Sequence, residues 1–299
     1  MRIAAISDIH ARPDGLDDDL IQAIRQRVEE LSPDIFIIAG DLSEEIIDLE
    51  HNLRVLALPR TTNLYVAGNH DVWFEEDLGL GSLEKYSKTI GEVCKKSGFM
   101  HLPDELHIQD DIAFVGSMGW YDYSFKRDDL DIPEENYIEK EWKGSVWRDY
   151  YAIDWPYTDK EATSLFDSKL NYDLETLPKD IRKVIFVSHH LPFRDLTLYK
   201  DYLPWDFFSA FMGSVSTGEI LREDNRVILT ISGHSHIRRR HIIDEITAIT
   251  VPLGYGRPNQ GKYSSLVNDA IAIIEIEDGA ARLEHFVEGD ICEGLPYIF

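Results

Sequence analysis

The chain contains few cysteines and few basic residues, and each shortage argues against a class of protein. Cys94 and Cys292 are its two cysteines, and they lie far apart without a CxxC or Cys/His spacing. A disulfide framework or a structural zinc site is therefore not expected. Lysine and arginine total 30 against 55 aspartate and glutamate residues, which gives a formal net charge of -25. Long nucleic acids bind clustered basic residues, so they are poor candidates for partners.

Long apolar runs are missing as well. No uninterrupted apolar stretch reaches the roughly 18 residues that a membrane span needs, and the N-terminus begins with an expected strand instead of a basic and then apolar leader. We therefore expect a cytoplasmic protein that does not enter a membrane. Its 299 residues, 43% of them hydrophobic, show no repeat, which favours one elaborated domain over residues 1–299. Nothing in the sequence indicates the oligomeric state.

Polar residues that can bind metals directly follow short apolar runs. The runs are typical of buried strands and lie at residues 3–6, 35–39, 64–67, 184–187 and 227–231. Because α/β proteins gather their sites at the carboxyl edge of a sheet, we expect the polar residues to meet there. These residues are Asp8, His10, Asp41, Asn69, His70, Asp71, His189, His190, His234 and His236.

The spacing of these residues favours a two-metal site for phosphoester chemistry. In an extended segment residues two apart point to the same face, so Asp8 and His10 can present two ligands together, as can the pair His234 and His236. A glycine precedes three of the candidates, which suits a sharp turn or a close approach of the backbone to a metal or a phosphate. These glycines are Gly40, Gly68 and Gly233.

Helical patterns alternate with the strands in the first third of the chain. Helices are predicted over residues 14–31, 43–56 and 82–96, and a β-α-β-α-β order implies parallel pairing. Because the second half lacks regular crossover helices in its pattern, we expect an α/β fold with two mixed sheets flanked by helices. The later strands are predicted at residues 106–108, 112–115, 183–187, 227–231, 238–242, 248–251, 270–275 and 282–286.

Residues 118–178 are aromatic and acidic and show no clear strand pattern. We expect this stretch to be a cap insertion that folds over the sheet edge. Its aromatic side chains could stack on a base or cover an apolar leaving group. The alternative is that they form a hydrophobic core within the insertion itself. The glycine- and proline-rich stretch 251–258, with Tyr255 and Arg257, is a second candidate for a substrate rim.

The ordered motifs resemble those of the calcineurin-like metallophosphoesterase superfamily. The matching segments are Asp8-x-His10, Gly40-Asp41, Gly68-Asn69-His70-Asp71, His189 and Gly233-His234-x-His236. The resemblance implies a four-layer αββα sandwich with a dinuclear metal centre. It assigns one metal to Asp8, His10 and His236, the second metal to Asn69, His189 and His234, and the bridge between them to Asp41. His189 occupies the family position after its strand, and His190 is the alternative ligand.

The resemblance also implies attack on phosphorus by a metal-bound hydroxide. His70 is then expected to stabilise the phosphoryl oxygens or to protonate the leaving oxygen, and Asp71 to orient His70. Carboxylate, imidazole and amide ligands suit Mn, Fe, Zn, Co or Ni as the two metals.

The expected substrate is a small phosphodiester or phosphomonoester, with nucleotides among the options. Protein phosphatases of the superfamily show GDxVDRG and GNHE, whereas this chain has GDLSEE at residues 40–45 and GNHD at 68–71. Arg12 and residues 238–240 are candidate phosphate contacts, although alternation along a strand sends at least one of those three arginines to solvent. A nuclease and a noncatalytic metal-binding scaffold of the same fold are the alternatives.

Overall fold

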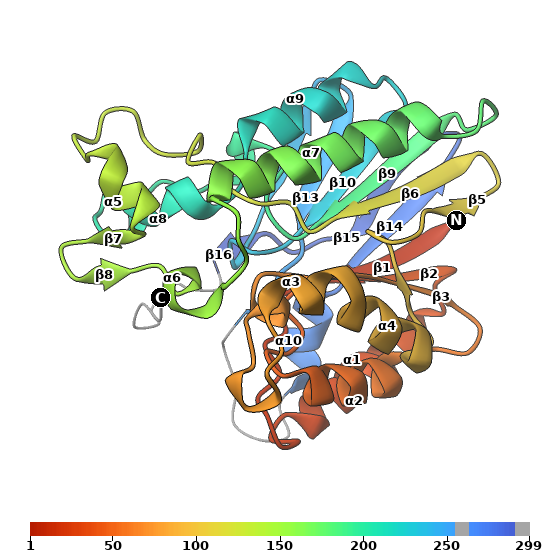
Figure 1. Cartoon of the computed structure of the whole chain (residues 1–299). Helices are drawn as coiled ribbons and strands as arrows, with labels where there is room; N and C mark the ends of the chain where they lie inside the picture. The colour runs from red at the N-terminus through yellow and green to blue at the C-terminus, as the bar shows by residue number, and fades with distance from the viewer. Residues whose placement is uncertain (255–262, 291–299) are drawn as a thin grey trace.

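Two six-stranded sheets lie face to face in the computed structural model, which describes residues 1–254 and 263–290 (Figure 1). Helices cover the outer side of each sheet, so the predicted four-layer α/β sandwich is confirmed. The candidate rim residues Tyr255 and Arg257 lie outside the described residues, as does Cys292. Among the helices that the structure describes, none combines the length and the apolar character that crossing a membrane requires.

The first sheet has the strand order β15-β14-β1-β2-β3-β4. Neighbours from β1 to β4 are parallel, whereas β14 is antiparallel to both β1 and β15. The predicted β-α-β-α-β opening is confirmed, and the helices of this half cover the outer face of the sheet (Figure 1). The strands are β1 (Arg2–Ile6), β2 (Ile35–Ala39), β3 (Thr62–Val66), β4 (Met100–His101), β14 (Ala272–Glu277) and β15 (Ala280–His285); the helices are α1 (Asp18–Leu31), α2 (Ile46–Leu56), α3 (Ser82–Glu84), the π-helical turn η3 (Lys85–Thr89), α4 (Ile90–Ser97) and α10 (Tyr263–Ala270).

The second sheet has the order β12-β13-β10-β9-β6-β5, and its four central strands are parallel to one another. Helix α7 (Asp159–Thr176) connects β6 to β9, and α9 (Val215–Glu223) connects β9 to β10. The prediction that this half lacks crossover helices is therefore wrong. The buried face of α7 carries three aspartates among its apolar residues, which breaks the apolar period. The strands are β5 (His107–Gln109), β6 (Ile112–Ser117), β9 (Lys183–Ser188), β10 (Val227–Ser232), β12 (Arg240–Ile243) and β13 (Ile246–Thr250).

An apolar layer between the two sheets holds the sandwich together. It contains Ile37, Leu64, Phe114, Ile185 and Ile231, all with fully buried side chains. The other faces of the same strands pack against the helices, so the central strands are buried on both sides and appear in the sequence as continuous apolar runs. The polar residues that follow these runs consequently emerge at one end of the sandwich.

Residues 118–178 contain two structurally different parts. The first contains helices α5 (Glu134–Ile138) and α6 (Asp149–Ala152) and a short hairpin of β7 (Glu141–Trp142) with β8 (Ser145–Val146). The second is α7, which belongs to the outer layer over the second sheet (Figure 1). We call residues 118–158 the insertion below.

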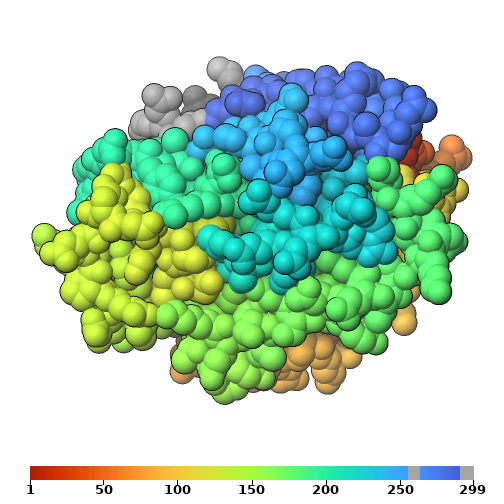
Figure 2. Space-filling model, turned by 90° about the horizontal axis from the view of Figure 1, so that it is seen from above, coloured from red at the N-terminus to blue at the C-terminus, as the bar shows by residue number. Residues whose placement is uncertain are grey.

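The insertion lies at one end of the molecule, against the segment around α8 (Trp205–Phe208) (Figure 2). Aromatic pairs join the two: the ring centroids of Tyr137 and Phe207 lie 5.1 Å apart, and those of Trp147 and Phe211 lie 5.4 Å apart. Many of the predicted cap aromatics therefore form a core. The remaining short elements are η1 (His70–Val72), η2 (Glu76–Leu78), η4 (Arg194–Leu196), η5 (Ser209–Phe211), β11 (Ile237–Arg238) and β16 (Gly289–Asp290).

A fully buried lysine fastens the loops that follow β2 and β3. The Lys85 ammonium donates hydrogen bonds to the backbone carbonyls of Glu44 (2.7 Å) and Trp73 (2.8 Å). It also pairs with the Glu75 carboxylate at 2.7 Å. Since a buried charge needs partners, this lysine fixes the relative position of two loops that carry polar candidates.

Replacing Lys85 with methionine is expected to lower the free energy of unfolding by about 3–5 kcal/mol, because the substitution leaves the largely buried Glu75 carboxylate without its cation. Urea denaturation would measure the change. Lys88→Met is the matched control: Lys88 lies on the same π-helical turn but is exposed, and its loss is expected to cost less than about 0.5 kcal/mol. Equal effects of the two substitutions would contradict the role of Lys85.

Candidate metal centre

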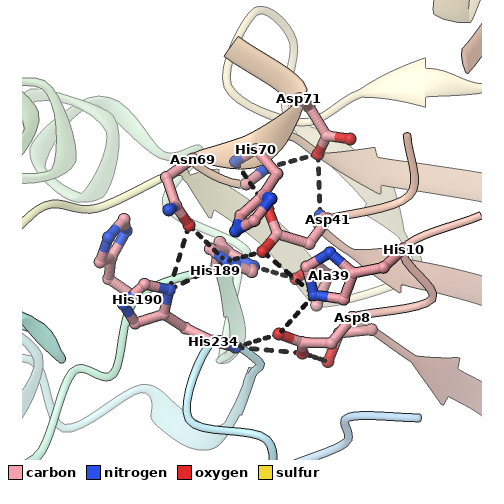
Figure 3. A network of polar contacts seen from close by, with 12 residues as sticks. Asp8, His10, Ala39, Asp41, Asn69, His70, Asp71, His189, His190 and His234 are labelled. Carbon is pink, nitrogen blue, oxygen red and sulfur yellow. Dashed lines mark hydrogen bonds and ion pairs between the residues drawn. The ribbon is translucent and has the colours of Figure 1, made fainter. Parts of the chain in front are cut away.

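Two sets of buried acidic and imidazole side chains meet at the carboxyl ends of the central strands (Figure 3). Within each set, every residue has one atom that can bind a metal, and these atoms all lie within 4.8 Å of one another. Asp41 belongs to both sets, which is the position that the family resemblance gives to a bridging ligand. One set is Asp8, His10, Asp41 and His236, and the other is Asp41, His189 and His234.

In the first set, the Nε2 atoms of His10 and His236 lie 3.0 Å apart. His236 Nε2 lies 3.1 Å from Asp8 Oδ1, and His10 Nε2 lies 3.6 Å from Asp41 Oδ2. The Asp8 carboxylate also accepts hydrogen bonds from the backbone N–H of His234, at 2.9 and 3.0 Å. This contact ties the end of β1 to the loop after β10, so the two sheets meet at this carboxylate.

In the second set, His189 Nε2 lies 3.2 Å from both Asp41 Oδ2 and His234 Nδ1. Asn69 joins the set, because its Oδ1 lies 3.1 Å from each of these two ring nitrogens. The remaining ring nitrogens donate to backbone carbonyls, His189 Nδ1 to Ala39 (2.9 Å) and His234 Nε2 to Phe211 (3.1 Å). These outer bonds leave an electron pair of each ring facing the set, as is usual for histidines that bind metals.

The shifted pKa values of Asp41 and His189 fit a centre that favours a positive charge. Burial would raise the pKa of the Asp41 carboxyl, but His189, His70 and His10 hold it well below its usual range. Burial also opposes a charge on His189, yet Asp41 raises the pKa of this imidazole to about 9. Burial and nearby histidines lower the pKa of His10 and of His234. In the absence of a metal, a proton on His189 supplies the positive charge that this cluster of acceptors needs.

Five of the candidate ligands have a backbone conformation that L-residues rarely adopt. Their φ angles lie between 45° and 67°, in the left-handed region. Each such conformation costs a non-glycine residue on the order of 1–3 kcal/mol, and conformations of this kind cluster at functional sites. The five are Asp8 (52°), His10 (45°), Asp41 (55°), His234 (67°) and His236 (53°). These residues are therefore not extended, and the predicted alternation is not what brings their side chains together.

The predicted need for glycine before the candidate ligands holds at Gly40, Gly68 and Gly233. A Cβ atom on Gly233 would collide with Asp8 and Ser7. A Cβ atom on Gly68 would collide with the carboxylate of Asp41, and one on Gly40 would collide with the imidazole of His189. Gly40 also has a φ of 89°. The absence of a side chain at these positions therefore lets the ligands approach the backbone closely.

Asp71 does not orient His70, which corrects one prediction. Its carboxylate accepts hydrogen bonds from the backbone N–H groups of Asp41 (2.8 Å), Leu42 (2.9 Å), Ser43 (3.0 Å) and Gly68 (2.7 Å). The short helix η1 turns the side chain of Asp71 back under the loop after β2, away from the ring that precedes it (Figure 3). Asp71 thus holds the backbone that carries Asp41.

His70 is held by two residues that the sequence analysis missed. Its Nδ1 lies 3.1 Å from Glu44 Oε1, and its ring stacks on Trp73 with a centroid distance of 3.7 Å. The centroid of the His10 ring lies 4.6 Å away, so His70 faces the first set of ligands. Glu44 lies three residues after Asp41, and Trp73 lies three residues after His70. This spacing from the motif residues is the signal that could have identified them.

The geometry separates His189 from His190. His189 lies in the second set, whereas His190 Nδ1 contacts the carbonyl of Met118 at 3.2 Å and its ring packs against Trp120. Burial and the neighbouring His189 lower the pKa of His190 to about 3. His190 is thus a neutral ring that packs behind the cluster, with its centroid 4.1 Å from that of His234.

Most of the arginines proposed to bind phosphate are engaged elsewhere. Arg12 pairs with the buried Asp17 at 2.6 Å. Arg238 is buried and donates from Nε to the Val287 carbonyl at 2.9 Å, and Arg239 donates to the Thr197 carbonyl at 2.8 Å. Arg240 is exposed, as alternation along the strand predicts for at least one of the three.

The family model for calcineurin-like phosphoesterases matches residues 1–238. The layered fold and the clustered acids and imidazoles define a metallophosphoesterase, and this match covers most of the chain. The protein therefore belongs to the calcineurin-like phosphoesterase family. No curated protein matches the sequence.

Several solved structures share the fold. A phosphopantetheinyl hydrolase from Mycobacterium tuberculosis superposes with a TM-score of 0.67 and 21% identity, over 85% of this chain and 89% of its own. A dimetal phosphatase from Danio rerio gives a TM-score of 0.55 and 13% identity, over 97% and 96%. GAP50, the anchor in the inner membrane complex of Plasmodium, gives 0.51 and 11% identity, over 97% and 89%. Similarity at these identities establishes the fold alone.

Asp41→Asn is expected to weaken the binding of both metals by at least about 100-fold, because losing even an outer partner of a ligand costs about 10–100-fold. Isothermal titration with Mn²⁺ and metal counting after gel filtration would measure the loss. His70→Gln removes a neighbouring imidazole that lies outside both ligand sets, so it is expected to retain two metals. If Asp41→Asn retained both metals, Asp41 would not be the bridge.

Proposed function

We propose that this protein is a dinuclear metal-dependent hydrolase of small phosphodiesters or phosphomonoesters. The observation that carries the proposal is the pair of ligand sets joined at Asp41, with His70 beside the first set. Asp8, His10 and His236 would hold one ion, Asn69, His189 and His234 the other, and Asp41 both. Carboxylate, imidazole and amide donors suit Mn, Fe, Zn, Co or Ni. When bound, two such ions activate water and neutralise phosphoryl oxygens.

His70 is the residue that we assign to the chemistry outside the ligand sets. Glu44 engages its Nδ1 and Trp73 stacks on its ring, so the imidazole is fixed in place. Its Nε2 then remains to donate a proton or a hydrogen bond. We assign the acceptor to be a phosphoryl oxygen or the leaving oxygen of the ester. A general acid at such a position accelerates the reaction about 10²–10⁴-fold.

The charge around the site supports a small substrate over a nucleic acid. Arg12, Arg238 and Arg239 are each bound to a protein group, Arg12 to a carboxylate and the other two to backbone carbonyls. The net charge of -25 repels polyanions as well. These observations disfavour the alternative of a nuclease. A cytoplasmic location stays a prediction.

A noncatalytic scaffold is the remaining alternative, and GAP50 shows that a protein described as an anchor has this fold. The full set of ligand-type residues favours the enzyme. A scaffold would gain nothing from keeping Asp8, Asp41 and His234 in left-handed conformations, since each of these conformations costs free energy.

Metal removal and reloading would test the proposal. Chelated protein reloaded separately with Mn, Zn, Ni, Co or Fe is expected to hydrolyse bis-p-nitrophenyl phosphate or p-nitrophenyl phosphate only with metal, and the preferred compound ranks diesters against monoesters.

His70→Gln is expected to keep both metals and to lower kcat about 10²–10⁴-fold. Two bound metals without turnover of either ester would favour the scaffold.

Arg148 is the basic residue that we propose to bind a negatively charged group of the substrate. It is exposed, and its guanidinium lies 4.8 Å from the centroid of the Trp73 ring on which His70 stacks. Burial alone would raise the pKa of Glu44, but His70 lowers it. The positive charge of Arg148 lowers this pKa further. A cation at this position can reach a phosphate oxygen near His70.

Arg148→Gln is expected to raise KM for anionic phosphoesters about 10-fold while changing kcat less than about 3-fold, because an exposed arginine binds substrate and transition state alike. Steady-state kinetics with the better of the two nitrophenyl esters would measure both constants. Lys143→Gln removes an equal charge from the turn between β7 and β8 and serves as the control. An unchanged KM in Arg148→Gln would remove this residue from the substrate site.

A further inference from the structure

One buried carboxylate of the insertion gathers four hydrogen bonds beside the second ligand set. Asp149, the first residue of α6, is 2% exposed. Its Oδ1 accepts from Asn69 Nδ2 (2.9 Å) and Trp73 Nε1 (2.8 Å). Its Oδ2 accepts from the Tyr121 hydroxyl (3.0 Å) and Trp147 Nε1 (2.8 Å). The partners include two residues of the loop after β3, so the carboxylate connects the insertion to the ligand sets.

The contact with Asn69 decides which end of its amide faces the metal centre. An amide group has a donating and an accepting end of nearly equal size, but only the oxygen can bind a metal. Asn69 Oδ1 lies 3.1 Å from the ring nitrogens of both His189 and His234. A carboxylate can only accept hydrogen bonds, so it holds the NH₂ end of Asn69 and leaves the oxygen facing the centre.

We propose that Asp149 is a positioning residue for the second metal, which makes the insertion part of the metal centre. The proposal rests on the dinuclear site of the proposed function. Asp149 acts by fixing the amide of Asn69, and it also holds the indole of Trp73, on which His70 stacks. The Asp149 carboxylate thereby fixes Asn69, a candidate ligand, and Trp73, on which the proposed acid His70 stacks.

The first residue of α7, which directly follows the insertion, has a carboxylate that serves as a natural comparison. Asp159 is 7% exposed and accepts from Trp120 Nε1 (2.9 Å), from Lys140 Nζ (2.5 Å) and from the hydroxyl of Tyr123. Its partners all belong to the insertion, and none of them is a candidate ligand. Asp149 and Asp159 are therefore both buried and both accept from an indole and a phenol, but Asp159 also pairs with Lys140, and only Asp149 contacts the second ligand set.

The test compares Asp149→Asn with Asp159→Asn in the full-length protein, titrated with Mn²⁺ and followed by calorimetry and by electron paramagnetic resonance. In Asp149→Asn an NH₂ group replaces one acceptor oxygen, so two of the four donors lose their partner and the negative charge that holds the NH₂ end of Asn69 is removed. We expect the affinity for the second Mn²⁺ to fall about 10–100-fold. The first Mn²⁺ is expected to bind within about 3-fold of its original affinity. Asp159→Asn is expected to keep both affinities and the spectrum of a coupled Mn²⁺ pair.

A second pair of substitutions covers the case in which Asp149→Asn does not fold. Tyr121→Phe removes one donor from Asp149, and Tyr123→Phe removes one from Asp159. We expect Tyr121→Phe alone to weaken the second Mn²⁺ about 3- to 10-fold, because Asp149 loses part of its restraint. If Asp149→Asn folds and binds the second Mn²⁺ normally, or if the two tyrosine variants bind it equally, the proposal is overturned. Failure of the unmodified protein to bind Mn²⁺ would instead contradict the proposed function.

Discussion

The rest of the structure depends on a buried cluster of electron-pair donors around Asp41. Imidazole nitrogens, an amide oxygen and carboxylate oxygens face one another at 3.0 to 3.6 Å. Where two such atoms both present electron pairs they repel one another unless a proton or a metal ion lies between them, and burial makes the repulsion stronger. Asp41 raises the pKa of the His189 imidazole to about 9 against the effect of burial, which fits a cluster that favours a positive charge. A cluster of this kind is stable only inside a scaffold that prevents its members from turning away.

The scaffold applies this restraint at several levels. The candidate ligands follow strand ends, and five of them have left-handed backbone conformations. Asp71 binds four backbone N–H groups of the loops that carry Asp41 and Asn69, and Lys85 fastens the loops that carry Glu44 and Trp73. Because these contacts are buried, they offset the conformational cost of the ligands. The stability of the fold and the geometry of the centre are therefore coupled.

The sequence predicted that the candidate ligands gather at one sheet edge, because each lies within a few residues of a strand end and parallel strands bring their ends together. Their division into two sets was implied by the family resemblance. It did not predict contacts made across long stretches of chain. Asp149 lies 80 residues from Asn69, and no local pattern connects them. Asp71 was assigned to its neighbour His70, but the turn at η1 directs its carboxylate to the backbone of another loop. The helix α7 was missed because Asp159, Asp167 and Asp173 lie on its buried face, where hydrogen bonds replace apolar contacts.

The central claim is that two metal ions share Asp41, and anomalous scattering from crystals of the Mn-loaded protein tests it most directly. Two ions that share Asp41 should give two peaks about 3.5–4 Å apart, the usual separation of paired catalytic metals. One peak should lie among Asp8, His10 and His236, the other among Asn69, His189 and His234, and Asp41 should contact both. A single peak, or two peaks that do not share Asp41, would show that Asp41 is not a bridging ligand.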